Sequence, residues 1–448
     1  PCTTFSTDYT LRLMLFFEKK LIDLGLYNTY RNLIMTASRV LTSVEKNGLY
    51  VDRAFNQELL DSYLPKIEAA KEAIYNLHKV KKFTTIYNQS KIEKYIAKLG
   101  NPRDEIERSY FQYKCQMQFN GKGITFLLNL VSFPVAILYW LKYGKKVQVN
   151  HLEQKNLVFF RDGKPENILP ESLKNRYKAI ESNPVEGTLL TAKDKKFIKG
   201  IICRYPFSWQ FILKCLIKIG RYSFAIEEYS PEAIVVCAEY SFTSSVLTAY
   251  CKQRNIKHID VMHGEKMYYM RDSFFKFDEC YIWDEYYGKI LASMKADKNQ
   301  FVVEVPASLK FDGELIRTQK YDYTYYLGAE SEEVLKEISK ILEQLNKSGK
   351  KISIRPHPRY SNMDLVKKIF DFANVEDTAK ISIEQSLLQS GAAISLYSTV
   401  LNQALCNSIP IIIDNMSNPE NFNKLKELGY VCLYKEHRLL SEVLEKSV

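Results

Sequence analysis

The stretch from residue 350 to residue 414 constrains the fold of this 448-residue chain more than any other. It contains a short β-branched strand at 352–354, a second strand at 392–396 and a third in the segment IPIIID, with helical patterns between them. Consecutive strands that are joined through a helix usually pair in parallel, because a parallel neighbour needs a long crossover connection. The stretch therefore predicts half of an α/β domain with a parallel sheet.

Polar side chains follow two of these strands. The first strand runs into the segment RPHPR (355–359), and the second runs into YST (397–399), which also begins a helical pattern. Ligands of open parallel sheets lie beyond the carboxyl ends of the strands. We therefore expect a phosphate group to bind where these two polar clusters meet.

Each residue of these clusters has a chemical use and a plainer alternative. His357 can donate a hydrogen bond or a proton to a departing phosphate, and Arg355 and Arg359 can add charge-assisted bonds. Ser398 and Thr399 offer hydroxyls and free backbone N–H groups at a helix start, where anions are favoured. The alternative is that Ser398 only caps the helix and His357 is an ordinary loop histidine. Two further residues complete the predicted donor-binding set: Pro358 and Ser395.

A second, separate series of alternating strands and helices begins near residue 156. Strand patterns occur at 156–160, 232–237, 256–262 and 278–283, and amphipathic helices lie between them. A linker is expected around residues 306–321. We predict two Rossmann-like α/β domains, at 151–315 and 316–448.

The residues before this series are predicted to be helical over 1–120. The segments TDYTLRLMLFFEKKL and RVLTSVEKNGLYVD resemble the end of the exonuclease domain and the start of the thumb in family A DNA polymerases. The family's last exonuclease carboxylate falls at Ser6, and the palm carboxylates have no counterpart. The resemblance therefore implies a relic or a fused fragment without nuclease or polymerase activity.

The most apolar run of the chain lies between these regions, in the segment 121–150. The eighteen residues from Ile124 to Leu141 contain no charge, which is the lower limit for a membrane span. Asn129, Ser132 and Pro134 weaken a spanning helix. We expect a helical hairpin that is buried or lies at a membrane interface.

Composition indicates which kinds of partner and which cellular compartment to expect for the protein. The formal net charge of +11 favours anionic partners such as nucleotides, anionic glycans or a membrane surface, without selecting one. Nine scattered cysteines without a CxxC pair favour a reduced, cytoplasmic protein, and no metal-ligand spacing is present. The segment PCTTFSTDYT lacks the pattern of a secretory signal.

The two polar clusters of the C-terminal half also carry a family resemblance. RPHPR followed by ISLYSTV resembles the His-Pro and Ser-Ser/Thr motifs of bacterial sialyltransferases and related CMP-Kdo transferases. The longer segment SIEQSLLQSGAAISLYSTV is also similar to CDP-glycerol glycerophosphotransferases. The resemblance implies a metal-independent transferase of the GT-B architecture without a cofactor, with a cytidine nucleotide donor in the C-terminal domain and the acceptor in the N-terminal domain.

Such a transferase also needs a general base, which these sialyltransferases take from an acidic-acidic-Gly motif that this chain lacks. Glu239 and Glu265, each just past a strand of the first series, are the candidates, with Asp162 and Asp312 behind them. His263 and Gly264 resemble the HG step of several surface-polysaccharide transferases, and they are expected to bind the donor or the acceptor.

The sequence thus predicts a glycosyltransferase that moves sialic acid or Kdo from a CMP-linked donor to a capsule or lipopolysaccharide glycan. We expect it in the cytoplasm, peripherally on the inner face of the membrane. A CDP-polyol phosphotransferase is the alternative within the class. A nucleic-acid-binding protein related to the polymerases, and an artificial junction of two genes, are the alternatives outside it.

Overall fold

The computed structural model describes residues 89–143, 155–160, 168–182, 184, 186–311 and 318–446, which belong to one compact unit, Phe83–Val448. Both polymerase-like segments lie outside the described residues, as do Asp162 and Asp312. Within the described part, the strands form two six-stranded sheets in which every pairing is parallel. The predicted pair of Rossmann-like α/β domains is therefore confirmed.

The first sheet has the order β2-β1-β3-β4-β5-β6. Its strands are β1 (Leu157–Phe159), β2 (Ile180–Ser182), β3 (Ala233–Val236), β4 (Lys257–Val261), β5 (Glu279–Ile282) and β6 (Phe301–Val303). Three helices precede this sheet in the chain: α5 (Gln89–Leu99), α6 (Glu105–Met117) and α7 (Gly121–Tyr143). The helices between its strands are α9 (Glu171–Arg176), α10 (Ala192–Arg204), α11 (Trp209–Tyr229), α12 (Ser244–Gln253) and α13 (Glu285–Ser293).

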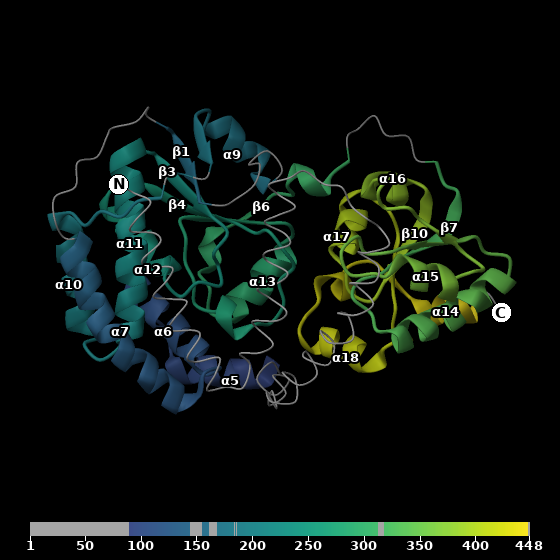
Figure 1. Cartoon of the computed structure of the whole chain (residues 1–448), viewed down its shortest axis with the longest axis horizontal. Helices are drawn as coiled ribbons and strands as arrows, with labels where there is room; N and C mark the ends of the chain where they lie inside the picture. The colour runs from purple at the N-terminus through teal and green to yellow at the C-terminus, as the bar shows by residue number, and fades with distance from the viewer. Residues whose placement is uncertain are drawn as a thin grey trace, which may run out of the picture. The chain divides into compact units, whose positions relative to one another are not determined.

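The second sheet has the order β12-β11-β10-β7-β8-β9. Its strands are β7 (Tyr321–Tyr326), β8 (Ile352–Arg355), β9 (Asn374–Val375), β10 (Ser390–Ser395), β11 (Ile411–Ile413) and β12 (Arg438–Leu439). Its helices are α14 (Glu332–Lys347), α15 (Met363–Ile369), α16 (Ile383–Leu388), α17 (Thr399–Cys406), α18 (Pro419–Glu427) and α19 (Leu440–Glu445). Figure 1 labels β1, β3, β4 and β6 of the first sheet and β7 and β10 of the second.

Both faces of each sheet are covered, as buried parallel sheets require. In β1, Leu157 and Phe159 belong to the apolar cluster that includes Leu173 of α9, whereas Val158 belongs to the cluster of α11 and α12 on the other face. The same alternation divides the second sheet between α14, α15 and α19 on one face and α16, α17 and α18 on the other. The α17 face of the second sheet shares one continuous core cluster with the first domain.

Helix α14 shows why these segments fold as they do. Its buried residues recur at helical spacing: Leu335, Ile338, Ile341, Leu342 and Leu345. Its opposite face carries Glu–Lys pairs three or four residues apart, which suit an exposed helix surface. Periodicity and charge placement therefore agree along the whole helix.

The apolar run is one continuous helix, α7, which passes through Pro134. The prediction of a hairpin was wrong, because no turn interrupts the run. Helix α7 is also long and apolar enough to cross a membrane by length and composition, and only 11% of its apolar window is buried. Its polar side faces the protein: Asn129 accepts a hydrogen bond from the backbone N–H of Gln210 (3.0 Å), and Ser132 is buried.

Candidate functional site

The candidate donor site lies where the strand order of the second sheet changes direction. The chain builds β8 and β9 on one side of β7 and then crosses to place β10, β11 and β12 on the other. The switch point is therefore between β7 and β10, and open α/β sheets bind ligands in the crevice at such a point. Gly328 follows β7 there, and Ser398 and Thr399 follow β10.

The two predicted polar clusters are not on neighbouring strands. β7 separates β8, which leads to His357, from β10, which leads to Ser398. Strands lie about 4.8 Å apart, so the two strand ends are about 10 Å from each other. A ligand that bridges both clusters must therefore also cross the end of β7, including Gly328.

The start of α17 offers both a cap and an unused hydroxyl. The hydroxyl oxygen of Ser398 accepts a hydrogen bond from the backbone N–H of Val400 (3.2 Å), so this side chain caps the helix. The exposed Thr399 side chain has no hydrogen-bond partner among the described residues. The first backbone N–H groups of a helix have no hydrogen-bond partner within the helix. An anion at Thr399 would therefore accept hydrogen bonds both from the Thr399 hydroxyl and from these N–H groups.

The histidine of the RPHPR segment has a defined hydrogen-bonding direction. The Nδ1 atom of His357 accepts a hydrogen bond from the backbone N–H of Arg359 (3.1 Å), and Tyr360 stacks on the ring at 4.4 Å between centroids. An imidazole that accepts at Nδ1 carries its proton at Nε2. His357 is therefore arranged to donate from Nε2–H, beside the exposed Pro358 and Arg359.

Two members of the predicted set are engaged inside the domain. The guanidinium of Arg355 is 2.8 Å from the carboxylate of Glu376 and donates to the carbonyl of Ile381 (3.0 Å). The Ser395 hydroxyl donates to the carbonyl of Tyr326 (2.9 Å), which joins β10 to β7. Both residues thus stabilise the sheet edge, and their contact with a phosphate stays a prediction.

Glu265 connects the edge of the first sheet with the candidate donor site. Its carboxylate accepts hydrogen bonds from the hydroxyl of Tyr287 (2.9 Å) and from the side-chain amide of Asn402, which lies on α17. Burial raises the pKa of Glu265 to about 7, although both hydrogen bonds act in the opposite direction. This carboxyl group can therefore exchange a proton near neutral pH.

Glu239 has a different environment from Glu265. It is 1% exposed and forms an ion pair with Lys266, itself 8% exposed. Burial lowers the pKa of this lysine. Glu239 is thus enclosed and charge-paired, whereas Glu265 is half-buried, and which of the two acts as a base stays a prediction.

The loop after β4 contains the other predicted residues. His263 is exposed and Gly264 is half-buried, and both directly precede Glu265. Sequence reasoning missed Tyr287 and Asn402, which hold the Glu265 carboxylate. Asn402 follows Ser398 by four residues, and that spacing on one helix face could have indicated it.

In the described ranges, no group of three histidine, cysteine, aspartate or glutamate side chains could hold a metal ion.

Comparisons with known proteins give distant structural similarity. No family model matches the chain, and no curated protein matches it. A lipopolysaccharide outer core galactosyltransferase, WaaB, is 10% identical with a TM-score of 0.36, over 66% of this chain and 94% of that one. The wall teichoic acid polymerase TagF is 12% identical with a TM-score of 0.38, over 75% and 87%. Anabaena HepE in complex with UDP is 10% identical with a TM-score of 0.36, over 65% and 89%.

Proposed function

We propose that this protein is a glycosyltransferase that moves a sugar from a CMP-linked donor, with sialic acid or Kdo as the sugar, to a hydroxyl of a surface glycan. The observation that supports this most directly is the hydrogen bond between Asn402 and Glu265. It fixes the candidate base of one domain against the helix whose start is the candidate phosphate site of the other. Asn402 follows Thr399 by three residues, about 4.5 Å along the helix axis.

The proposed reaction uses each group in one role. Glu265 takes the proton from the acceptor hydroxyl, and the acceptor oxygen forms a bond to the anomeric carbon of the donor sugar. The bond from that carbon to the phosphate oxygen breaks, and CMP leaves with the electron pair. The Thr399 hydroxyl, the N–H groups at the start of α17 and the Nε2–H of His357 stabilise the charge that develops on the leaving phosphate.

A CDP-polyol phosphotransferase is the second candidate, because the SIEQSLLQSGAAISLYSTV spacing is similar in those enzymes. In that reaction the acceptor oxygen attacks phosphorus, and the product is a phosphodiester. Both reactions release CMP, so the released nucleotide does not distinguish them. Phosphorus NMR of the product formed from CMP-sialic acid, CMP-Kdo or CDP-glycerol distinguishes the two reactions, because only the phosphotransferase product contains a phosphodiester.

Nucleotide binding tests the donor site without knowledge of the acceptor. We expect CMP and CDP to raise the melting temperature in the presence of a metal chelator, with about 2.7 kcal/mol of stabilisation at a hundredfold excess over the dissociation constant. Uncharged cytidine, which lacks the phosphate, should bind more weakly, and Thr399→Val should reduce the difference between CMP and cytidine. Tight binding of UDP or GDP without a response to CMP would contradict a cytidine donor.

We further propose that α7 places the protein on an anionic membrane surface. Its outward face is apolar, with Phe126 71% exposed, Leu138 66% and Leu141 62%, and it has no acidic residue. Lys122 and Lys142 lie near its two ends, where anionic head groups would be. Because one side of α7 packs on α11 through contacts such as Phe133–Trp209, an orientation parallel to the membrane fits better than a span.

A further inference from the structure

The first sheet has a switch point of its own, and a cavity lies there. The chain places β2 on one side of β1 and then crosses to place β3 on the other. A cavity of about 470 Å³ is lined by Phe160, which follows β1, and by Cys237 and Ala238, which follow β3. Its position, at the carboxyl ends of parallel strands, is where such sheets bind ligands, and its size suits a small molecule.

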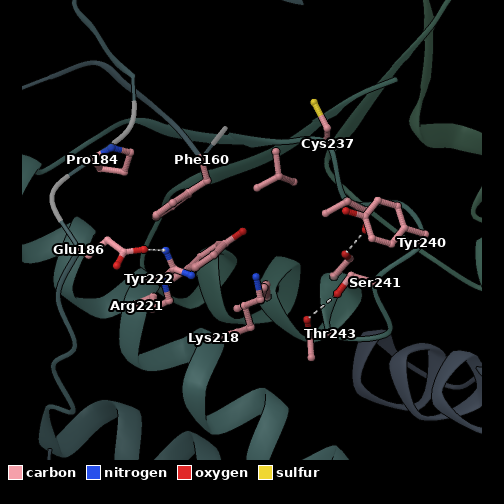
Figure 2. A pocket seen from close by; sticks show the side chains of 14 residues that line it. Phe160, Pro184, Glu186, Lys218, Arg221, Tyr222, Cys237, Tyr240, Ser241 and Thr243 are labelled. Atoms are coloured by element: carbon pink, nitrogen blue, oxygen red, sulfur yellow. Dashed lines mark hydrogen bonds and ion pairs between the residues drawn. The ribbon is translucent and has the colours of Figure 1, made fainter. Parts of the chain in front are cut away.

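One wall of this cavity is basic. Lys218 and Arg221 of α11 both line it, one helical turn apart (Figure 2). Arg221 forms an exposed ion pair with Glu186 at 2.9 Å. Lys218 has no hydrogen bond or ion pair with any residue that the structure describes, so the wall presents one uncompensated positive charge.

The electrostatic environment of Lys218 favours an anion beside it. Lys218 is exposed at the cavity, but the protein atoms around its ammonium group partly desolvate it and lower its pKa, and the nearby charges of Arg221 and Lys214 lower it further. A bound anion would raise the pKa of Lys218 again, because its negative charge would offset the positive charges of Arg221 and Lys214. Among the described residues that line the cavity, Glu186 is the one with a carboxylate, and it is paired with Arg221.

Another wall of the cavity carries hydroxyl groups from the segment that begins α12. Ser241 and Thr243 share a hydrogen bond of 2.9 Å between their hydroxyls, and Ser244 donates to the carbonyl of Ala238 (2.6 Å). Figure 2 shows Ser241 and Thr243 on the side of the cavity away from Glu186. Hydroxyl groups both donate and accept, so this wall suits the polar edge of a sugar or polyol.

The remaining wall is formed by aromatic rings. Phe160 and Tyr222 stack with centroids 5.1 Å apart and planes 12° apart. The Tyr222 hydroxyl is engaged with Nε2 of His258 (3.0 Å) and is therefore held in place. The cavity thus combines a cation, hydroxyl groups and an apolar surface.

We propose that this cavity binds the phosphate group of a phosphorylated sugar or polyol, with Lys218 as the residue that contacts the phosphate. The inference rests on the proposed function, because it assigns the class of acceptor: a glycan end that carries a phosphate. We infer phosphate as the anion because Lys218 and Arg221 together can donate charge-assisted hydrogen bonds to several of its oxygens.

Binding of glucose 1-phosphate and glycerol 3-phosphate to the full chain tests this inference, with glucose and glycerol as uncharged counterparts. We expect the phosphates to bind in isothermal titration calorimetry and the uncharged compounds not to. Lys218→Gln should weaken phosphate binding about tenfold or more, the size expected for a hydrogen bond to a charged group. Lys214→Gln is the matched control, since both lysines are exposed on α11, one turn apart, and only Lys218 lines the cavity.

Two results would overturn the inference. One is equal binding of the phosphorylated and the uncharged compounds. The other is an equal effect of Lys218→Gln and Lys214→Gln. CMP binding separates this inference from the proposed function, because the donor site is on the other sheet. A Lys218→Gln protein that still binds CMP but responds to phosphates like the wild type would refute the cavity site alone.

Discussion

The side-chain amide of Asn402 donates a hydrogen bond to the carboxylate of Glu265, although Asn402 lies on α17 of the second domain and Glu265 lies in the loop after β4 of the first. Tyr287 contacts both, through bonds of 2.9 Å to Glu265 and 3.3 Å to Asn402. The three side chains therefore form a polar contact inside the apolar cluster that the two domains share. Burial raises the pKa of the Glu265 carboxyl group to about 7 at this contact between the two domains.

The first prediction concerns Glu265 as the general base. Glu265→Gln should abolish transfer and leave CMP binding intact, because glutamine keeps the size of the side chain but cannot accept the proton. In the wild type, the rate should rise with pH through about 7 as the carboxyl group ionises. Tyr287→Phe removes a hydrogen bond that stabilises the ionised form, so it should move this rise to higher pH. An unchanged pH profile in Tyr287→Phe would argue that the base is another residue.

The second prediction concerns His357 as a donor to the leaving phosphate. His357→Ala should reduce turnover by about 10²-fold or more, the usual range for a positioned proton donor or acceptor. His357→Gln should recover part of the rate, because the glutamine amide can place an N–H near the former Nε2 position. His437→Ala serves as the control, since this histidine, outside the candidate site, makes its one hydrogen bond among the described residues with the carbonyl of Lys435. A normal rate in His357→Ala would remove His357 from the mechanism.

The third prediction separates Glu239 from catalysis. Glu239→Gln leaves Lys266 buried without its counter-ion, so we expect a loss of about 3–5 kcal/mol in the free energy of unfolding. Glu420→Gln, which removes an exposed pair with Lys424, should cost less than about 1 kcal/mol. Urea unfolding measures both. If Glu239→Gln keeps full stability but loses transfer, Glu239 and not Glu265 is the base.

The fourth prediction concerns the dependence of stability on pH. Burial raises the pKa of Asp260 to about 7 and that of Asp272 to about 6, above the value of about 3.9 in an unfolded chain. The folded state therefore binds more protons, and this contribution is fully present below about pH 4 and is lost as the pH rises through 6 to 7.

The comparison of the wild type with Asp260→Asn isolates this effect. His258 acts in the opposite direction, because burial lowers its pKa to about 3 and stability then rises toward pH 6.5. The difference in melting temperature between the variant and the wild type should therefore change in favour of the variant from pH 5 to pH 8. A constant difference would show that Asp260 has the same pKa in both states.

The fifth prediction concerns α7. Flotation with liposomes that contain anionic lipid should fall when Phe126 and Leu138 are replaced by serine, because both side chains are more than half exposed. Val303→Ser is the control, since this exposed valine lies on β6. Unchanged flotation in the α7 variant, or no flotation of the wild type, would contradict a membrane surface at α7.

The long strands and helices were predictable because each carries its own periodic signal. The strands around Ile354 and Ile412 are short runs rich in β-branched residues, the strand around Ile394 is a short buried run, and α14 repeats its apolar residues at helical spacing. The edge strands β2, β6, β9 and β12 were missed because they are short and contain no fully buried residue, unlike the equally short β1 and β11. Such a segment becomes a strand only because a neighbouring strand offers hydrogen bonds.

The sequence by itself determined the two parallel sheets and the position of polar residues at their carboxyl ends, because local periodicity and the need for helical crossovers fix both. Only the tertiary structure decided what those residues do. It paired Arg355 with Glu376 and Glu239 with Lys266, and it placed Glu265 beside Asn402, 137 positions away. These pairings depend on burial and on partners that are distant in the chain, and no local sequence pattern predicts either.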